Sequence, residues 1–176
     1  MPVPIEIDVW QGEIAELEVD AIIVPANESL FMTNPAARTV RRVAGEGVER
    51  DAVQQGPIQP GNAVITGGGN LAAPYLVHAV AVGHELKGNH DDLVSALNAA
   101  LDMTARLSLA RVAIAPIGIE RGVFSPEESA AALVEVLERR SRSGDPIPTS
   151  MVIAVANPIE AAAFLAATEA LRAAFR

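Results

Sequence analysis

Six short apolar runs mark the chain, and helix-like patterns separate most of them. Runs of this length predict β-strands, here at residues 5–9, 21–24, 62–66, 75–82, 112–116 and 151–155. Strands that alternate with helices indicate a mostly parallel or mixed sheet with helices on both faces. The segment 62–82 differs because a glycine loop without a helix joins its two strands, and we expect a hairpin or an antiparallel neighbour there.

Capping signals locate several helices between these strands. Asn34 can cap a helix whose first residue is Pro35 and which continues to about residue 44. Leucines at positions 93, 97 and 101 predict a helix over residues 91–109. Ser125 and Glu128 form a capping box for a helix that runs to about residue 139. Residues 158–175 are predicted to form the last helix, and 141–148 a solvent loop rather than a domain linker.

The length of 176 residues suits one domain, which we expect to span 1–176. Its apolar stretches are broken well short of the roughly 18 residues that a membrane helix needs, and no basic region leads into an apolar one at the N-terminus. The chain has no cysteine, which excludes disulfides and thiolate metal sites. The histidines show no metal-ligand spacing. We therefore expect a soluble, cytoplasmic protein without membrane contact, metal or cofactor.

The formal charge of −9 limits the ligands that the chain can attract. A field of this sign repels nucleic acid and anionic membranes. Aromatic residues, which single-stranded nucleic acid binders use as stacking platforms, make up only 3% of the chain. We expect no nucleic acid partner, and we expect an anionic ligand to be a small molecule held locally by backbone amides.

The run 19–27, VDAIIVPAN, carries the first candidate functional residue. A strand that is apolar throughout is typically buried on both faces of a sheet, so Asn27 follows it at the edge where open α/β sheets bind ligands. An amide can both donate to and accept from sugar hydroxyls. Alternatively, Asn27 only stabilises the turn after the strand, as asparagine commonly does.

Five segments together resemble the macro domain family, the ADP-ribose-binding module. Residues 11–14 read QGEI, the run 19–27 follows, and VAG closes a helix-like segment at 43–45. Further along, TGGGNL at 66–71 and YLVH at 75–78 keep the spacing of the family pattern T-x-G-x-x-L-P-x-x-Y-V-I-H, with Ala72 in place of its proline. The resemblance covers nearly the whole chain and implies a three-layer α/β/α sandwich around a six-stranded mixed sheet.

The resemblance also implies roles for particular residues. Glu13 stands where the family has the acidic residue that accepts a hydrogen bond from the adenine amino group, and the adjacent Ile14 is a candidate ligand-binding residue as well. Asn27 stands where the family holds the distal ribose. The family's glycine run is replaced by residues 32–36, MTNPA, in which Asn34 starts the helix that follows and Thr33 and Asn34 are candidate ligand-binding residues. A helix N-terminus attracts anions through its free amides and dipole, although Pro35 supplies no amide proton.

A second phosphate loop is expected after the strand at 112–116. Residues 117–125 read IGIERGVFS, against a family pattern like S-T-G-I-Y-G-Y-P. Glu120 near a diphosphate would repel it unless it is screened. Ordinary loop geometry and a core aromatic are the alternative interpretations of this segment. The candidate ligand-binding residues of this loop are Gly118, Arg121, Gly122, Val123 and Phe124.

Two departures from the family pattern bear on activity. The hydrolytic members carry a catalytic aspartate where this chain has Ala37, so no catalytic residue can be named. After the last strand, Ala156-Asn157-Pro158 lacks the family's adenine-stacking aromatic. We expect weak binding of ADP-ribose, of an ADP-ribosylated protein, or of a related nucleotide-sugar ligand. The alternatives are an ADP-ribosyl or O-acetyl-ADP-ribose ester hydrolase, and a degenerate module that acts in protein interaction or regulation.

Overall fold

A six-stranded sheet forms the centre of the computed structural model, which describes residues 5–174. The strands lie in the order β1-β6-β5-β2-β4-β3 and all pair in parallel except β3, which is antiparallel to β4. The antiparallel neighbour expected within 62–82 is thereby confirmed. The strand bounds are β1 Glu6–Gln11, β2 Ala21–Ala26, β3 Asn62–Gly67, β4 Tyr75–Val80, β5 Arg111–Ile114 and β6 Ser150–Val155.

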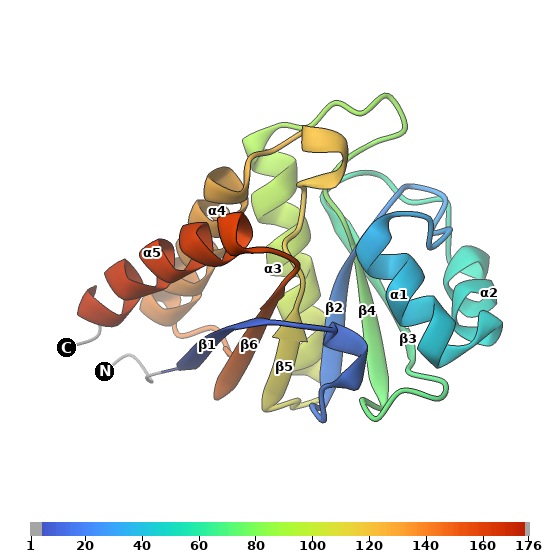
Figure 1. Cartoon of the computed structure of the whole chain (residues 1–176), viewed down its shortest axis with the longest axis horizontal. Coiled ribbons are helices and arrows are strands. Elements are labelled where there is room, and N and C mark those ends of the chain that lie inside the picture. The colour runs from blue at the N-terminus through green and yellow to red at the C-terminus, as the bar shows by residue number, and fades with distance from the viewer. Residues whose placement is uncertain (1–4, 175–176) are drawn as a thin grey trace.

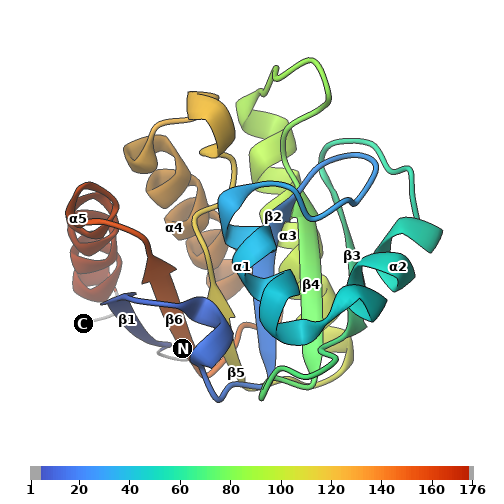
Figure 2. The ribbon, with the colours of Figure 1, turned by 45° about the vertical axis from the view of Figure 1, so that its right-hand side comes forward.

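Helices cover both faces of the sheet, which confirms the three-layer α/β/α arrangement (Figure 1). The helices α1 and α2 pack on one face against β2 and β3, and the turned view of Figure 2 brings them forward. On the other face α3 packs on β3 and β4, α5 packs on β1 and β6, and α4 lies between α3 and α5. The helix bounds are α1 Pro35–Ala44, α2 Glu46–Gln54, α3 His90–Arg106, α4 Pro126–Ser143 and α5 Pro158–Ala174.

The capping residues read from the sequence do start their helices. The Asn34 side chain accepts from Ala37 N at the start of α1, and both hydrogen bonds of the capping box are present at the start of α4. Helix α4 runs four residues past the predicted end, to Ser143. Helix α2 was not predicted, because its two buried residues, Val48 and Ala52, are too few to form a visible period.

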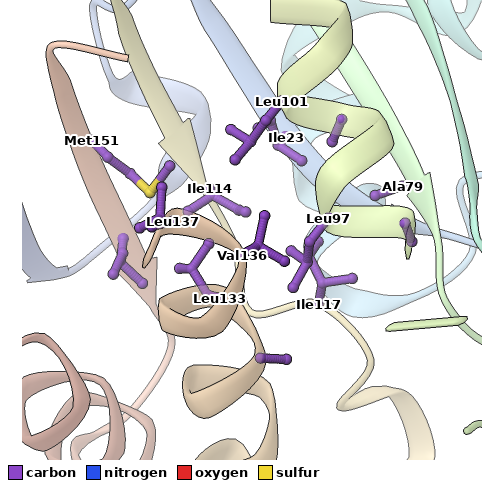
Figure 3. Close-up of a cluster of buried hydrophobic side chains, with 14 of the residues drawn as sticks. Ile23, Ala79, Leu97, Leu101, Ile114, Ile117, Leu133, Val136, Leu137 and Met151 are labelled. Carbon is purple, nitrogen blue, oxygen red and sulfur yellow. The ribbon is translucent and has the colours of Figure 1, made fainter. Parts of the chain in front are cut away.

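The larger core cluster lies between the sheet and helices α3, α4 and α5. Figure 3 shows Leu97 and Leu101 of α3 and Leu133 of α4 directed toward Ile23 and Ile114 of the sheet. A second cluster fills the opposite face beneath α1. Every residue of β2 is buried, as expected for a strand covered on both faces. Within residues 5–174, no helix combines the length and apolar character needed to cross a membrane.

Candidate functional site

A cleft opens where strands β2 and β5 stop pairing. Their ladder joins Ala21–Ile23 to Val112–Ile114, and its last bond runs from Ala115 N to Ile23 O at 3.0 Å. Alternate residues of a strand direct their backbone N–H and C=O groups to the same side, so those of Pro25 point toward β5, as those of Ile23 do. Pro25 lies past the end of the ladder between β2 and β5, and its missing N–H therefore costs no hydrogen bond of this ladder. The separation of these two strands leaves space at the carboxyl edge of the sheet.

This space is a cleft of about 480 Å³. Its walls come from the end of β1 with the short η1 turn (Ile14–Glu16), from the first turns of α1, from the segment after β5, and from the junction of β6 with α5. The lining residues are Gln11, Gly12, Glu13, Ile14, Pro25, Asn34, Pro35, Ala36, Thr39, Ala115, Pro116, Ile119, Glu120, Arg121, Ala154, Val155, Ala156 and Glu160.

Asn34 fixes the wall that α1 contributes. Its Oδ1 accepts from Ala37 N at 2.9 Å, and its Nδ2 donates to Pro25 O at 2.8 Å. The Arg38 amide bonds to the Asn34 carbonyl, and Pro35 has no N–H. Among the described residues, Ala36 therefore carries the one amide of this first turn without an acceptor. The helix N-terminus can offer a ligand only one amide hydrogen bond.

The segment after β5 forms a curled loop. Three of its residues have left-handed backbone: Gly118 (φ 89°), Arg121 (φ 50°) and Gly122 (φ 72°). The amides of Gly122, Val123 and Phe124 close the loop by donating to the carbonyls of Ile119, Glu120 and Gly118. The loop is anchored from α4, where the Ser129 hydroxyl donates to Ile117 O at 2.7 Å. Arg121 supplies the one cationic side chain among the residues that line the cleft.

Glu120 places a carboxyl group inside this loop. It lies in the η2 turn (Glu120–Gly122), and its Oε2 is buried without a hydrogen-bond partner among the described residues. Burial raises the pKa of Glu120 to about 6, while the backbone amides of Glu120 itself and of Gly118 offset part of that increase. The cleft therefore holds a carboxyl group that exchanges its proton close to neutral pH.

The end of the cleft formed by β1, β6 and the start of α5 carries two more carboxylates. Glu160 is buried, with Oε1 accepting from Ala156 N at 3.2 Å and Oε2 accepting from Asn157 Nδ2 at 2.8 Å. Glu13 is exposed and has no such partners among the residues described. No aromatic ring lines the cleft within the described part of the chain. Glu13 is thus the carboxylate at this end that is available to a ligand.

Trp10 is the aromatic side chain closest to this end of the cleft in sequence. A Cβ atom on Gly12 would lie 2.4 Å from its indole ring, so the ring packs directly on the Gly12 backbone. Gly12 itself lines the cleft. The chain has one tryptophan, so its fluorescence reports on this wall alone.

Asn27 and Thr33 lie outside the residues that line the cleft, and they contact each other. Asn27 Nδ2 donates to Phe31 O at 3.1 Å and to Thr33 Oγ1 at 3.3 Å, and Asn27 Oδ1 accepts from Ser29 Oγ at 2.9 Å. These bonds close the turn between β2 and α1. The structure therefore supports the turn interpretation of Asn27, and its contact with a ribose stays a prediction.

Only some of the other candidate residues line the cleft. Glu13, Ile14, Asn34 and Arg121 line the cleft. Phe124 is buried in the core cluster beneath the curled loop, where a Cβ atom on Gly118 would lie 2.7 Å from its ring. The remaining two residues, Gly122 and Val123, also lie outside the lining.

The lining residues with polar side chains that were not predicted as site residues are Gln11, Thr39, Glu120 and Glu160. Asn157 and Glu160 are three residues apart, which is the spacing of an N-cap residue and the third residue of its helix. The sequence therefore carried a capping signal that pointed to Glu160. Thr39 donates to Pro35 O and carried no such signal. No group of three or more His, Asp or Glu side chains within residues 5–174 is arranged to hold a metal ion.

Comparisons with known proteins agree on one family. The family model described as the macro domain matches residues 23–133. An uncharacterized protein of Aquifex aeolicus is 33% identical over 135 residues, which cover 76% of this chain and 82% of that protein. The ADP-ribose glycohydrolase MACROD2 of Xenopus laevis is 31% identical over 148 residues, 81% of this chain. The chain spans 35% of MACROD2 and 46% of a relative from Mycobacterium bovis.

Solved structures match the fold closely. The Trypanosoma brucei macrodomain in complex with ADP-ribose has a TM-score of 0.83 at 18% identity, over 93% of this chain and 69% of that one. The Oceanobacillus iheyensis macrodomain with ADP has a TM-score of 0.80 at 16% identity, over 94% of this chain and 91% of that one. At such low identity, these matches establish the shared fold.

Proposed function

Because this chain belongs to the macro domain family, we propose that its cleft binds ADP-ribose or an ADP-ribosyl group on a protein. The observation that carries the proposal is the cleft itself, where strands β2 and β5 diverge. It places an amide donor at the start of α1, an inward-curled loop with Arg121, and the Glu13 carboxylate around one space of about 480 Å³. A volume of this size suits a nucleotide-sized ligand.

We further propose that the binding is weak. The helix offers one free amide, Glu120 occupies the curled loop with a carboxyl group, and no aromatic ring of the described residues stands over the adenine end. Loss of a base-stacking partner costs about 1–3 kcal/mol. We therefore expect a dissociation constant between about 1 μM and 1 mM.

Titration of the purified protein with ADP-ribose tests this proposal. Calorimetry measures the affinity, and Trp10 fluorescence gives an independent signal because the indole packs on a residue of the cleft wall. Adenosine and ribose 5-phosphate, used as matched partial ligands, separate the contributions of the two ends. If millimolar ADP-ribose produces neither heat nor a fluorescence change, an interaction or regulatory module becomes the better hypothesis.

Hydrolysis of an ADP-ribosyl ester is the second candidate function. One observation favours it: the Glu120 carboxyl lines the cleft and has a pKa near 6, the range in which a carboxyl group can work as a general acid or base. MACROD2 is described as an ADP-ribose glycohydrolase. The test is release of ADP-ribose from an ADP-ribosylated protein. Because Ala37 occupies the usual aspartate position, we expect slow or undetectable release.

We also propose that the protein works in the cytoplasm without nucleic acid. The charge of −9 and the absence of cysteine support this proposal. Cell fractionation and a binding assay with single-stranded and duplex DNA and RNA test its two parts separately.

A further inference from the structure

Glu120 stands in the cleft in an unusual position for an acidic residue. Its Oε2 is shielded from solvent and accepts no hydrogen bond from the described residues. The left-handed backbone at Gly118 and Arg121 curls the loop around it. Burial raises the pKa of Glu120 more than the backbone amides of Glu120 and Gly118 lower it, because burial removes water from the charged carboxylate. The neutral carboxyl form is favoured here for the same reason.

The charged groups around Glu120 do not compensate for its carboxylate. Arg121 is exposed, and the lining residues of α1, which are Pro35, Ala36 and Thr39, carry no charge. Across the cleft, Glu13 and Glu160 add negative charge. An incoming diphosphate would add more negative charge beside Glu120.

The segments that pack against the loop add no buried cation either. Gly88 of the segment before α3 contacts Phe124, but Glu85 and Lys87 of that segment pair with each other, with side chains 80% and 85% exposed. In the first turn of α4, Glu128 accepts from Ser125 N. The burial of Glu120 places its pKa at about 6, so a proton is available to it near neutral pH.

We propose that Glu120 determines which ligands the cleft accepts, because a diphosphate can occupy the cleft only beside the protonated carboxyl, which then donates a hydrogen bond to a phosphate oxygen. This inference rests on the proposed binding of ADP-ribose. It predicts that binding takes up one proton. It also predicts that the affinity for ligands with ionised phosphate groups falls as the pH rises, whereas the affinity for an uncharged nucleoside does not.

The test measures the ADP-ribose affinity of the full chain between pH 6 and pH 8. The protonated fraction of a carboxyl group with a pKa of about 6 falls from about one half at pH 6 to about one hundredth at pH 8, so the dissociation constant should rise about 50-fold over this range. Adenosine should show no comparable trend. Calorimetry in two buffers of different ionisation enthalpy should show the uptake of one proton per ADP-ribose at pH 7.5.

Glu120→Gln supplies the decisive variant, since the amide can donate a hydrogen bond at every pH. Its dissociation constant for ADP-ribose should not change between pH 6 and pH 8. At pH 8 it should bind ADP-ribose at least tenfold more tightly than the natural chain. Glu127→Gln is the matched control, because Glu127 is an exposed acid in the first turn of α4 outside the cleft lining. It should reproduce the natural pH dependence.

The outcomes separate this inference from the proposed function. Binding that is tight at pH 8, or a pH trend that persists in Glu120→Gln, overturns the role of Glu120 and leaves ADP-ribose as the ligand. Binding by Glu120→Gln alone supports the role of Glu120 and shows that the natural carboxylate excludes ADP-ribose. If neither form binds between pH 6 and pH 8, both the inference and the proposed function are wrong.

Discussion

The side-chain amide of Asn34 donates a 2.8 Å hydrogen bond to the carbonyl oxygen of Pro25, and this bond ties the start of α1 to the end of β2. The same side chain caps the helix through Ala37 N. Asn34 thus provides a hydrogen-bond partner for the Pro25 carbonyl, which lies beyond the last hydrogen bond between β2 and β5. It also provides one for the Ala37 amide, which has no partner within the helix. The cleft wall depends on both bonds.

Replacement of Asn34 by alanine should therefore reduce both stability and binding. Loss of the cap and of the Pro25 bond should lower the free energy of unfolding by about 1–3 kcal/mol. ADP-ribose affinity should fall as well, because the first turn of α1 is released from the cleft. Asn89→Ala is the matched control, since Asn89 caps α3 through Asp92 N away from the cleft lining. Equal ADP-ribose affinities in the two variants would contradict this role.

The three local hydrogen bonds of Asn27 predict a mainly structural effect of Asn27→Ala. The variant should unfold with a free energy lowered by about 0.5–2 kcal/mol, because the turn between β2 and α1 loses its cross-links. Thermal melts with and without ADP-ribose measure both properties. If the variant has an unchanged melting temperature without ligand but no longer melts at a higher temperature with ADP-ribose, Asn27 contacts the ligand instead.

The position of Ala37 predicts that a catalytic aspartate cannot be restored there. Its side chain is 1% exposed and belongs to the core cluster beneath α1, whereas Ala36 lines the cleft. Ala37→Asp should cost more than about 2 kcal/mol by burying a carboxylate and should not increase ADP-ribosyl hydrolysis. Ala36→Asp, matched in chemistry, should change stability by less than about 1 kcal/mol because a negative charge suits the first turn of a helix. Stable, active Ala37→Asp protein would disprove this.

His78 predicts that the protein loses stability in mild acid. Burial lowers the pKa of His78 to about 4, and the ring contacts Thr66 Oγ1 at 3.1 Å within the sheet. The unfolded chain binds a proton near pH 6.5 and the folded chain does not. Above pH 6.5 the ring is neutral in both states, so His78 does not make the free energy of unfolding depend on pH. As the pH falls from 6.5 toward 4, only the unfolded chain gains a proton on this ring, and the free energy of unfolding decreases progressively.

The full difference of 2.5 pH units, from 6.5 to about 4, corresponds to about 3 kcal/mol. Urea denaturation between pH 7.5 and pH 4.5 should show most of this loss. His78→Leu should have a shallower pH dependence over the same range, whatever its stability at pH 7.5. His90→Leu, which alters a histidine that is mostly exposed and paired with Glu135, serves as the control. A His78→Leu profile parallel to the natural one would exclude this histidine as the cause.

The sequence by itself determined the six strands, every α-helix except α2, and their arrangement in layers. Apolar runs of strand length and local caps such as Asn34 and Ser125 act within a few residues, so they can be read without knowledge of the rest of the chain. The pattern around residues 11–45 also identified the family and the edge of the sheet where the cleft lies. Glu13, Ile14, Asn34 and Arg121, which were named as site residues through the resemblance to the family, line the cleft.

The tertiary structure decided which side chains face the cleft and which are buried. Phe124 and Gly118 pack on each other in the core, and Asn27 closes its own turn, because their positions depend on contacts across the loop. Helix α2 is held by packing on α1 and β3 rather than by its own pattern. The raised pKa of Glu120 is likewise a product of burial in the folded chain, and no local pattern of residues can report how much water the fold excludes.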